Sequence, residues 1–182
     1  MTREHTVTIR RGVAADIPFI VQTERLEGYE ALVGSWEEAR HRREIASEST
    51  YLVGEAGGAP FGFAILRGWG APERVILVKR LAVSDPGKGL GSAFLRAIVD
   101  EAFRTTPVYR IWIGHFPENV RAHRAYRNVG FVPEGISRGS AYFGGVSRDE
   151  QILAIIRPDW EAAARLNLSR QSVEFSSGRS VR

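Results

Sequence analysis

The sequence contains no cysteine, so disulfide bonds, zinc–thiolate sites and cysteine nucleophiles are excluded. It also has no uninterrupted apolar run close to the roughly 20 residues that a membrane-spanning helix requires. The charged N-terminal segment 1–13 lacks an apolar stretch followed by a small-residue cleavage site, which is the pattern of a secretory signal. These absences predict a cytoplasmic protein without a membrane partner.

The excess of positive over negative charge is small over most of the chain. The charged residues nearest the C-terminus are Arg165, Arg170, Glu174, Arg179 and Arg182. Together they carry about +3 of the formal net charge of +4 at pH 7. The remainder is nearly neutral, which argues against a nucleic-acid partner. The length of 182 residues and hydrophobic content of 43% favour one domain. We expect it to span residues 1–158, with a polar and basic tail over 159–182.

The order of hydrophobic patterns indicates a mixed α/β domain. Alternating or continuous apolar runs bounded by glycine and proline predict strands at 6–10, 50–55, 61–69, 75–83, 109–115, 131–138 and 149–156. Helical spacing predicts helices from near Asp16, from Ser35, at 89–104 and at 119–130. Ser35 and Glu38 have the spacing of a capping box. Because hairpins and strand–helix–strand crossovers occur together, the sheet should be mixed.

Glycines crowd the segment "SDPGKGLGSAFLRAI", residues 84–98, between a buried strand and a helix. Glycine lets a backbone approach a ligand closely, and the amides at the start of a helix favour an anion. A Walker loop is excluded because Lys88 is followed by Gly89, and a dinucleotide fingerprint lacks its third glycine at Ser92. The alternative is a tight turn without a ligand.

A second pattern lies on the helix expected at 119–130. Asn119, Ala122 and Tyr126 have the spacing i, i+3 and i+7, which places them along one face. The alternative interpretation is that Asn119 only caps the helix and Tyr126 is a core aromatic residue.

Together, "LAVSDPGKGLGSAFL" and "ENVRAHRAYRNVGF" resemble the two signature regions of the GNAT superfamily of N-acetyltransferases. Gly89 and Gly91 match the glycines of its acetyl-CoA loop, whereas Pro86 stands where the family usually has Gln or Arg. The resemblance implies a mixed, mostly antiparallel sheet that is splayed between its central parallel strands and flanked by helices. It also implies acetyl-CoA as cosubstrate and no metal.

The same resemblance implies how acetyl-CoA would be held. The strand at 81–83 would bind the pantetheine arm, with backbone amides there stabilising the developing oxyanion. The expected acetyl-CoA-binding residues are Leu81, Ala82, Val83, Gly87, Lys88, Gly89, Leu90, Gly91, Ser92, Asn119, Ala122 and Tyr126. Tyr126 is also the expected general acid, because a tyrosine hydroxyl with a pKa near ~10 is protonated at neutral pH and can protonate the leaving thiolate.

The base that would deprotonate the amine is less defined by the sequence, because the central strand carries no carboxylate. His115, whose ordinary pKa is near ~6.5, and Glu73, through water, are the candidates. Glu24, Glu27 and Glu30 are further options, expected rather to be solvated or to orient the substrate. The amine could also arrive already neutral.

The resemblance also implies that the segment between the first strand and the hairpin, roughly residues 24–47, shapes the acceptor site. Tyr29, Glu30 and Trp36 are the expected substrate contacts there. Three functions remain open at this point. The first is N-acetylation of a small-molecule amine by direct attack in a ternary complex. The second is acetylation of a protein N-terminus or lysine, and the third is acyl-CoA binding without catalysis. A homodimer is also implied by the resemblance.

Overall fold

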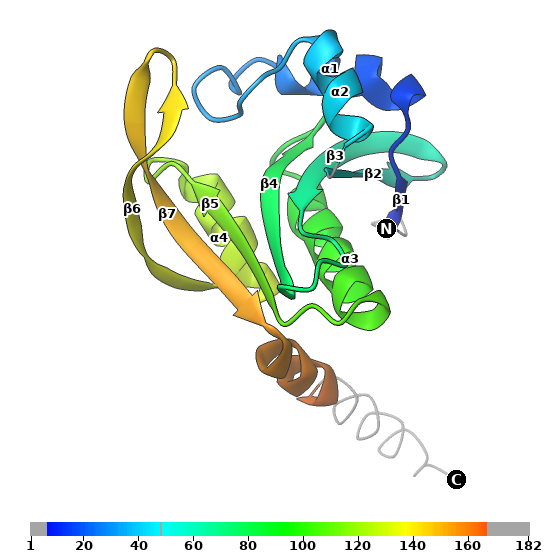
Figure 1. Ribbon diagram of the computed structural model, residues 1–182, viewed down its shortest axis with the longest axis vertical. Helices are drawn as coiled ribbons and strands as arrows, with labels where there is room; N and C mark the ends of the chain where they lie inside the picture. The colour runs from blue at the N-terminus through cyan, green and yellow to red at the C-terminus, as the bar shows by residue number, and fades with distance from the viewer. Residues whose placement is uncertain (1–6, 48, 167–182) are drawn as a thin grey trace, which may run out of the picture.

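The computed structural model describes residues 7–47 and 49–166 (Figure 1). Its strands are β1 (Val7–Arg11), β2 (Thr50–Ala56), β3 (Ala59–Arg67), β4 (Val75–Val83), β5 (Arg110–His115), β6 (Val132–Phe143) and β7 (Val146–Ile156). Its helices are the short 3-10 turn η1 (Ala14–Asp16), α1 (Ile17–Glu24), α2 (Glu38–Ile45), α3 (Leu90–Thr105) and α4 (Val120–Val129). Residues 157–166 are also helical.

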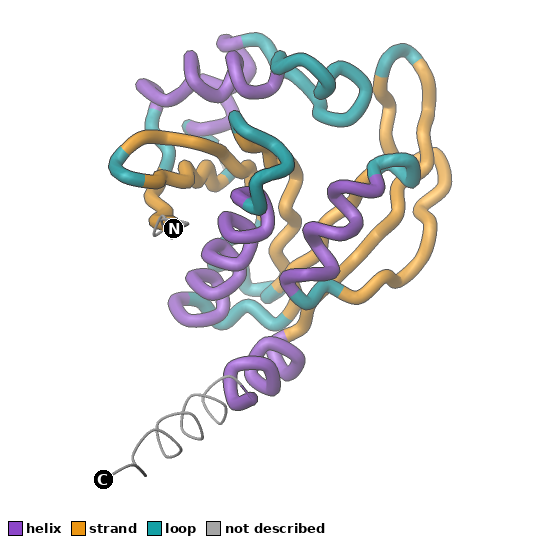
Figure 2. Tube along the Cα trace, turned by 180° about the vertical axis from the view of Figure 1, so that it is seen from behind, coloured by secondary structure: helices purple, strands orange, loops and turns teal. Residues whose placement is uncertain are grey.

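All seven strands form one sheet in the order β1-β2-β3-β4-β5-β7-β6. Only β4 and β5 are parallel neighbours, and every other pair is antiparallel. The expected mixed, mostly antiparallel sheet is thus confirmed. Helices α3 and α4 lie together on one face, in front of the sheet in Figure 2. Helices α1 and α2 pack against each other, and α1 contacts β3 and β4.

The two parallel strands, β4 and β5, diverge about halfway along β4. They are paired from Val75 with Arg110 to Val78 with Ile113, and beyond this point the described residues of β4 and β5 do not pair. A bulge at the same place leaves Lys79 without a partner on β3, since Arg80 pairs with Ile65 and Val78 with Leu66. A bulge bends its strand and strengthens the local twist. The sheet therefore opens into a V, as expected from the resemblance.

The sheet has a large hydrophobic core on its α3–α4 face and a smaller one on its α1–α2 face. Phe94, Ile98 and Phe103 of α3 are fully or almost fully buried in the larger core. Ile20 of α1 and Phe63 of β3 are fully buried in the smaller one. Helices therefore cover both faces of the sheet, with α3 and α4 on one face and α1 and α2 on the other, and they flank the open end of the V.

The start of α2 differs from the sequence prediction. The helix begins at Glu38 with Glu37 as its N-cap, and no side chain caps it, so the predicted start and capping box at Ser35 are wrong. The physical reason is that the backbone N–H of Trp36 donates to the carboxylate of Glu24 at 3.0 Å. This contact holds residues 34–36 in an irregular connection before the helix.

The β6–β7 hairpin is longer than predicted and ends near Gly144 (Figure 1). The helix at 157–166 crosses the expected boundary at 158, which stays a prediction. Thr6, expected to begin the first strand, and the tail from 167 onward lie outside the described residues.

Candidate active site

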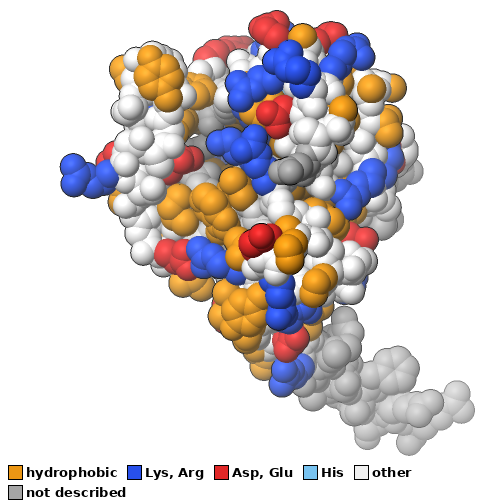
Figure 3. Space-filling model, viewed as in Figure 1, with side chains coloured by type: hydrophobic (Ala, Val, Ile, Leu, Met, Phe, Trp, Pro, Cys, Tyr) orange, Lys and Arg blue, Asp and Glu red, His pale blue; other side chains and the backbone are white. Residues whose placement is uncertain are grey.

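A cleft of about 1000 Å³ opens where β4 and β5 diverge. Its walls are the end of β4 with the glycine loop, the start of α3, one side of α4, the segment 29–36 and the tip of the β6–β7 hairpin. Figure 3 shows Lys and Arg side chains beside the hollow between the hairpin and the α1–α2 segment. The cleft is thus lined by both sequence motifs and also by two segments outside them, the segment 29–36 and the β6–β7 hairpin.

Backbone groups of β4 face the gap. Ser84 donates its N–H to the carbonyl of Phe61 on β3 at 2.7 Å. Because backbone groups alternate along an antiparallel pair, those of Leu81 and Val83 point the other way, toward β5. The Val83 carbonyl accepts a hydrogen bond from the Tyr29 hydroxyl at 2.8 Å. By the same alternation, the N–H groups of Leu81 and Val83 are directed into the gap. They form the hydrogen-bonding edge that an extended ligand arm would need.

The glycine loop has the backbone that its composition predicts. Gly87 and Gly89 have φ values of +94° and +81°, a region that other residues rarely adopt. Gly89 is the N-cap of α3, and no side chain caps this helix, so the amides of its first turn face the cleft. Lys88 instead pairs with Asp85 at 2.6 Å. Neither Lys88 nor Leu90 lines the cleft, whereas Gly91 and Ser92 do.

Tyr126 reaches the cleft from α4 with only 8% of its surface exposed. Among the described residues, its hydroxyl makes no hydrogen bond. Burial raises its pKa above the ordinary value, so the hydroxyl keeps its proton at neutral pH. Asn119 is the N-cap of the same helix, with its Oδ1 accepting the N–H of Ala122 at 3.1 Å, and both residues line the cleft.

His115 lies beside Tyr126, with ring centroids 5.8 Å apart. Its Nδ1 lies 2.7 Å from the Phe116 carbonyl oxygen, which can only accept, so Nδ1 carries the proton. Its Nε2 lies 3.2 Å from Nδ1 of His123. Burial lowers the pKa of His115, so the ring is neutral at pH 7 and Nε2 is an acceptor turned toward α4.

The remaining predicted residues are divided between the cleft and elsewhere. Tyr29, Glu30 and Trp36 all line the cleft. Glu73 does not, because it lies in the turn before β4, at the opposite end of that strand from Val83. The structure therefore brings His115 to the site but not Glu73.

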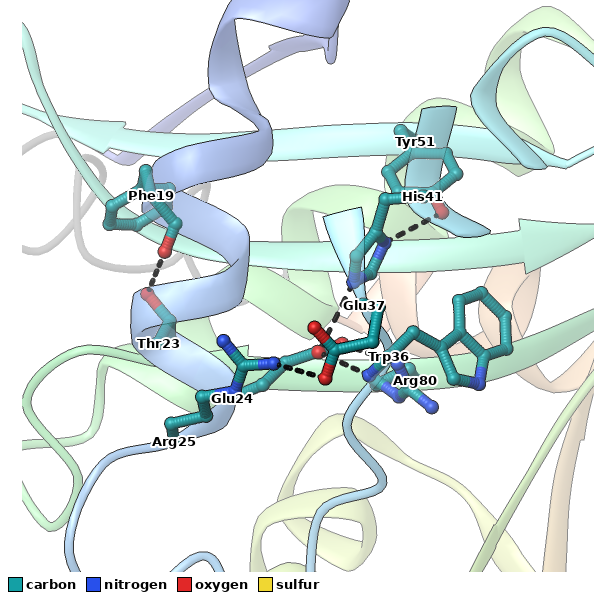
Figure 4. A network of polar contacts seen from close by, with 9 residues as sticks. All are labelled: Phe19, Thr23, Glu24, Arg25, Trp36, Glu37, His41, Tyr51 and Arg80. Carbon is teal, nitrogen blue, oxygen red and sulfur yellow. Dashed lines mark hydrogen bonds and ion pairs between the residues drawn. The ribbon is translucent and has the colours of Figure 1, made fainter. Parts of the chain in front are cut away.

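Glu24 was expected to be solvated or to orient substrate, and this is wrong. Its side chain is fully buried and forms an ion pair with Arg80 of β4. Its other oxygen lies 3.2 Å from Nε2 of His41. Figure 4 shows this carboxylate between the guanidinium and the imidazole, with Tyr51 hydrogen-bonded to the far side of His41. The available signal was spacing, since Glu24 follows Ile20 by one helical turn on the buried face of α1.

Glu150 of β7 is a cleft residue that the sequence analysis missed. Its Oε2 accepts a hydrogen bond from the Ser140 hydroxyl at 2.8 Å. The side chain lies over Gly114 of β5, where a Cβ atom would come within 3.0 Å of Glu150 Oε1. It shares the α1–α2 face of the sheet with Arg80, whereas His115 and Tyr126 lie on the α3–α4 face. The two faces of the gap thus carry different chemistry.

The described residues contain no group of three or more His, Cys, Asp or Glu side chains that could hold a metal ion. Within the same residues, no helix combines the length and the apolar character needed to cross a membrane.

Comparisons with known proteins agree with this geometry. The model of the acetyltransferase (GNAT) family matches residues 19–131. A probable N-acetyltransferase of Bacillus subtilis, YjcK, is 36% identical over 99 residues, which are 54% of this chain and 54% of that protein. The chain thus spans about half the length of this curated relative.

Solved structures with the same fold cover more than four fifths of this chain. The aminoglycoside acetyltransferase AAC(6')-Ib with coenzyme A has a TM-score of 0.73 at 23% identity, covering 86% of this chain and 98% of that one. A variant of the spermidine N-acetyltransferase SpeG from Vibrio cholerae has a TM-score of 0.69 at 20% identity, covering 82% and 93%. The family match extends over more than half of the chain and includes both signature regions, so this protein belongs to the GNAT acetyltransferase family.

Proposed function

We propose that this protein transfers the acetyl group of acetyl-CoA to the amino group of a small molecule, with both substrates bound at once. The observation that carries the proposal is the V between β4 and β5, which opens onto a cleft containing Tyr126. Two related proteins described above are named for aminoglycosides and spermidine, which are small-molecule amines. The cytoplasm is the location we propose for the reaction, and a homodimer stays a prediction.

The donor would lie on the α3–α4 side of the gap. The first-turn amides of α3 and the loop around Gly87 and Gly89 suit the pyrophosphate, because the positive end of the helix points there. With Pro86 in place of a polar side chain, backbone groups would carry this contact. The N–H groups of Leu81 and Val83 would then bind the pantetheine arm and the oxyanion that develops on the thioester carbonyl.

Tyr126 would act as the general acid. As the amine nitrogen bonds to the carbonyl carbon, the carbon–sulfur bond breaks and the thiolate takes the hydroxyl proton of Tyr126. The absence of another hydrogen bond on this hydroxyl among the described residues, together with its raised pKa, keeps that proton available. The competing proposal is that Tyr126 only packs against the pantetheine.

The amine must lose a proton on the other face of the gap, where the acceptor enters. Glu30 and Glu150 both line the cleft, and Glu150 is the one that lies over Gly114 of β5, so we propose it as the base in preference to His115. His115 lies on the same face as Tyr126 and directs its acceptor nitrogen toward His123. Glu73 lies at the far end of β4, so a proton from the amine could reach it only through a chain of water molecules.

A titration of acetyl-CoA, combined with thiol release across a panel of amines, tests the proposal. Tyr126→Phe should bind acetyl-CoA as wild type does while kcat falls roughly 100-fold or more. Tyr109→Phe is the matched control, since Tyr109 is an exposed tyrosine at the closed end of the V. Release stimulated only by peptides would favour a protein acceptor. Binding without any stimulated release would favour a non-catalytic module, and absent binding would refute the donor.

A further inference from the structure

The guanidinium of Arg80 has donors that the fold does not use. Its side chain is only 9% exposed, and it lines the cleft. Its Nη1 donates to Glu24, but among the described residues its Nε and Nη2 make no hydrogen bond. No buried side-chain nitrogen or oxygen of these residues lacks a partner, so Nε and Nη2 reach open space. That space is the cleft, which they supply with N–H donors from a side chain that is nine-tenths buried.

The surroundings hold this group in place. The indole of Trp36 lies against the guanidinium, with Arg80 Cζ 4.3 Å from the ring centroid (Figure 4). The Glu24 carboxylate is fixed in turn by the backbone N–H of Trp36 at 3.0 Å. A Cβ atom at Gly34 would come within 2.7 Å of Arg80 Nη2, so the chain also passes closely there. Arg80 is thus a preorganised donor, which binds an anion without first losing side-chain freedom.

A second cation lies beside it. Arg40 of α2 places its Cζ 4.1 Å from the centroid of the same Trp36 ring, and it too lines the cleft. The described cleft residues include five Lys or Arg side chains against two acidic ones, Glu30 and Glu150. A ligand that brought only positive charge would meet repulsion from Arg40, which forms no ion pair with the described residues, whereas the charge of Arg80 is balanced by Glu24.

We propose that the acceptor is a small amine that also carries an oxyanion group, a carboxylate or a phosphate, bound by Arg80 and Arg40. A guanidinium fork matches either group through paired N–H donors. Arg80 directly precedes Leu81 at the gap, so the anion would lie close to the acetyl group. The amino group would then face Glu150 on the same side of the sheet. This inference rests on the proposed function and names its substrate class.

The experiment compares amines in pairs that differ in charge. Thiol release from acetyl-CoA would be measured with amino acids and their amides, with glucosamine 6-phosphate and glucosamine, and with spermidine and kanamycin. We expect kcat/KM for an anionic member to exceed that of its neutral partner by about tenfold or more. The amino acid and amino-sugar phosphate pairs separate a carboxylate from a phosphate. A higher kcat/KM for the neutral partners, or for spermidine or kanamycin, would overturn the inference.

Two variants on one helix provide the matched test. Arg40 and Arg43 are both exposed residues of α2, but only Arg40 lines the cleft. Arg40→Gln should lower the ratio of kcat/KM for the anionic amine over its neutral partner about fivefold or more, and Arg43→Gln should leave that ratio unchanged. An equal ratio in all three proteins would contradict the inference.

The role of Arg80 is tested with a variant that keeps the charge. Arg80→Lys retains a cation beside Glu24 but loses the fork, so KM for the anionic amine should rise while acetyl-CoA binding is kept. If Arg80→Lys unfolds, the Arg40 variant decides. Amines acetylated without charge preference would refute only this inference, whereas no acetylation of any amine would refute the proposed function as well.

Discussion

Glu150 lies across Gly114, so that a Cβ atom at position 114 would come within 3.0 Å of its Oε1. The glycine on β5 thus leaves room for a carboxylate from β7 to reach the open V. Gly114→Ala should push this carboxylate aside by a few tenths of an ångström and lower kcat several-fold, since misplaced catalytic groups lose rate steeply. Steady-state kinetics with saturating acetyl-CoA would measure the effect.

Glu150→Gln separates position from charge. It keeps the shape of the side chain and the contact with Ser140, but it cannot accept the proton of the amine. We expect kcat at neutral pH to fall about 100-fold or more, with the affinity for acetyl-CoA unchanged. A variant as active as wild type would return the role of base to His115 or to water.

The glycine at position 91 gives a direct test of the donor loop. Its φ is not in the left-handed region, and a Cβ atom there would meet nothing within 4 Å. Gly91→Ala should therefore raise the free energy of unfolding by about 0.5–1 kcal/mol, as expected inside a helix. If acetyl-CoA approaches this backbone closely, its Kd should nevertheless rise about tenfold.

Gly89→Ala is the comparison for Gly91→Ala. Gly89 has a φ of +81°, so an alanine there should cost about 1–2 kcal/mol of stability even without ligand. Titration calorimetry and denaturant unfolding of both variants would separate backbone strain from loss of contact. An unchanged Kd in folded Gly91→Ala would mean that the loop is only a turn.

The two donor motifs were predictable because each is short and local. Gly89 is required by a turn within one loop, and Asn119 caps the helix that carries Tyr126. Hydrophobic periodicity also predicted the strands, since buried runs such as 75–83 have few alternatives. Structural features that depend only on residues close together in the sequence could therefore be predicted from the sequence.

The acceptor side was not predictable for two physical reasons. Glu24, Arg80 and Glu150 come from α1, β4 and β7, and the strand order β4-β5-β7 places the last two on either side of β5. In addition, strict alternation from Ile76 and Val78 would place Arg80 on the α3–α4 face. The bulge at Lys79 reverses this pattern, so that Arg80 turns toward Glu24 instead.

Burial of His115 makes stability depend on pH. Its pKa is lower in the folded protein than the ordinary value of 6.5, so the unfolded chain takes up this proton at a higher pH. The free energy of unfolding should accordingly fall as the pH drops below about 6.5, and the contribution is fully present above that value. His115→Asn keeps a donor near the Phe116 carbonyl but does not titrate.

Urea unfolding of wild type and His115→Asn at pH 7.5 and 5.0 would measure this contribution. The variant should lose less stability between the two pH values than wild type does. Equal losses would mean that the ring is not held neutral by its surroundings.

The helix at 157–166 provides a test of the domain boundary. Trp160 donates its Nε1–H to Asp100 at 2.6 Å and stacks on Phe103 of α3 with ring centroids 5.3 Å apart. Because the indole is only partly buried, Trp160→Ala should cost about 2–3 kcal/mol, less than a fully buried tryptophan. Acetyl-CoA affinity should not change, since this helix follows the closed end of the V.

Truncation extends the same test to the whole helix. A chain ending at residue 158 loses the Trp160 contacts, whereas one ending at residue 166 keeps them. Both chains contain Arg157, which donates to the Phe103 carbonyl at 2.9 Å. The shorter chain should unfold at a lower urea concentration. Its free energy of unfolding should fall by about as much as in Trp160→Ala, because the Trp160 side chain makes the contact with the core. Equal midpoints for the two chains would place the domain boundary at 158 after all, and would make the helix an appendage.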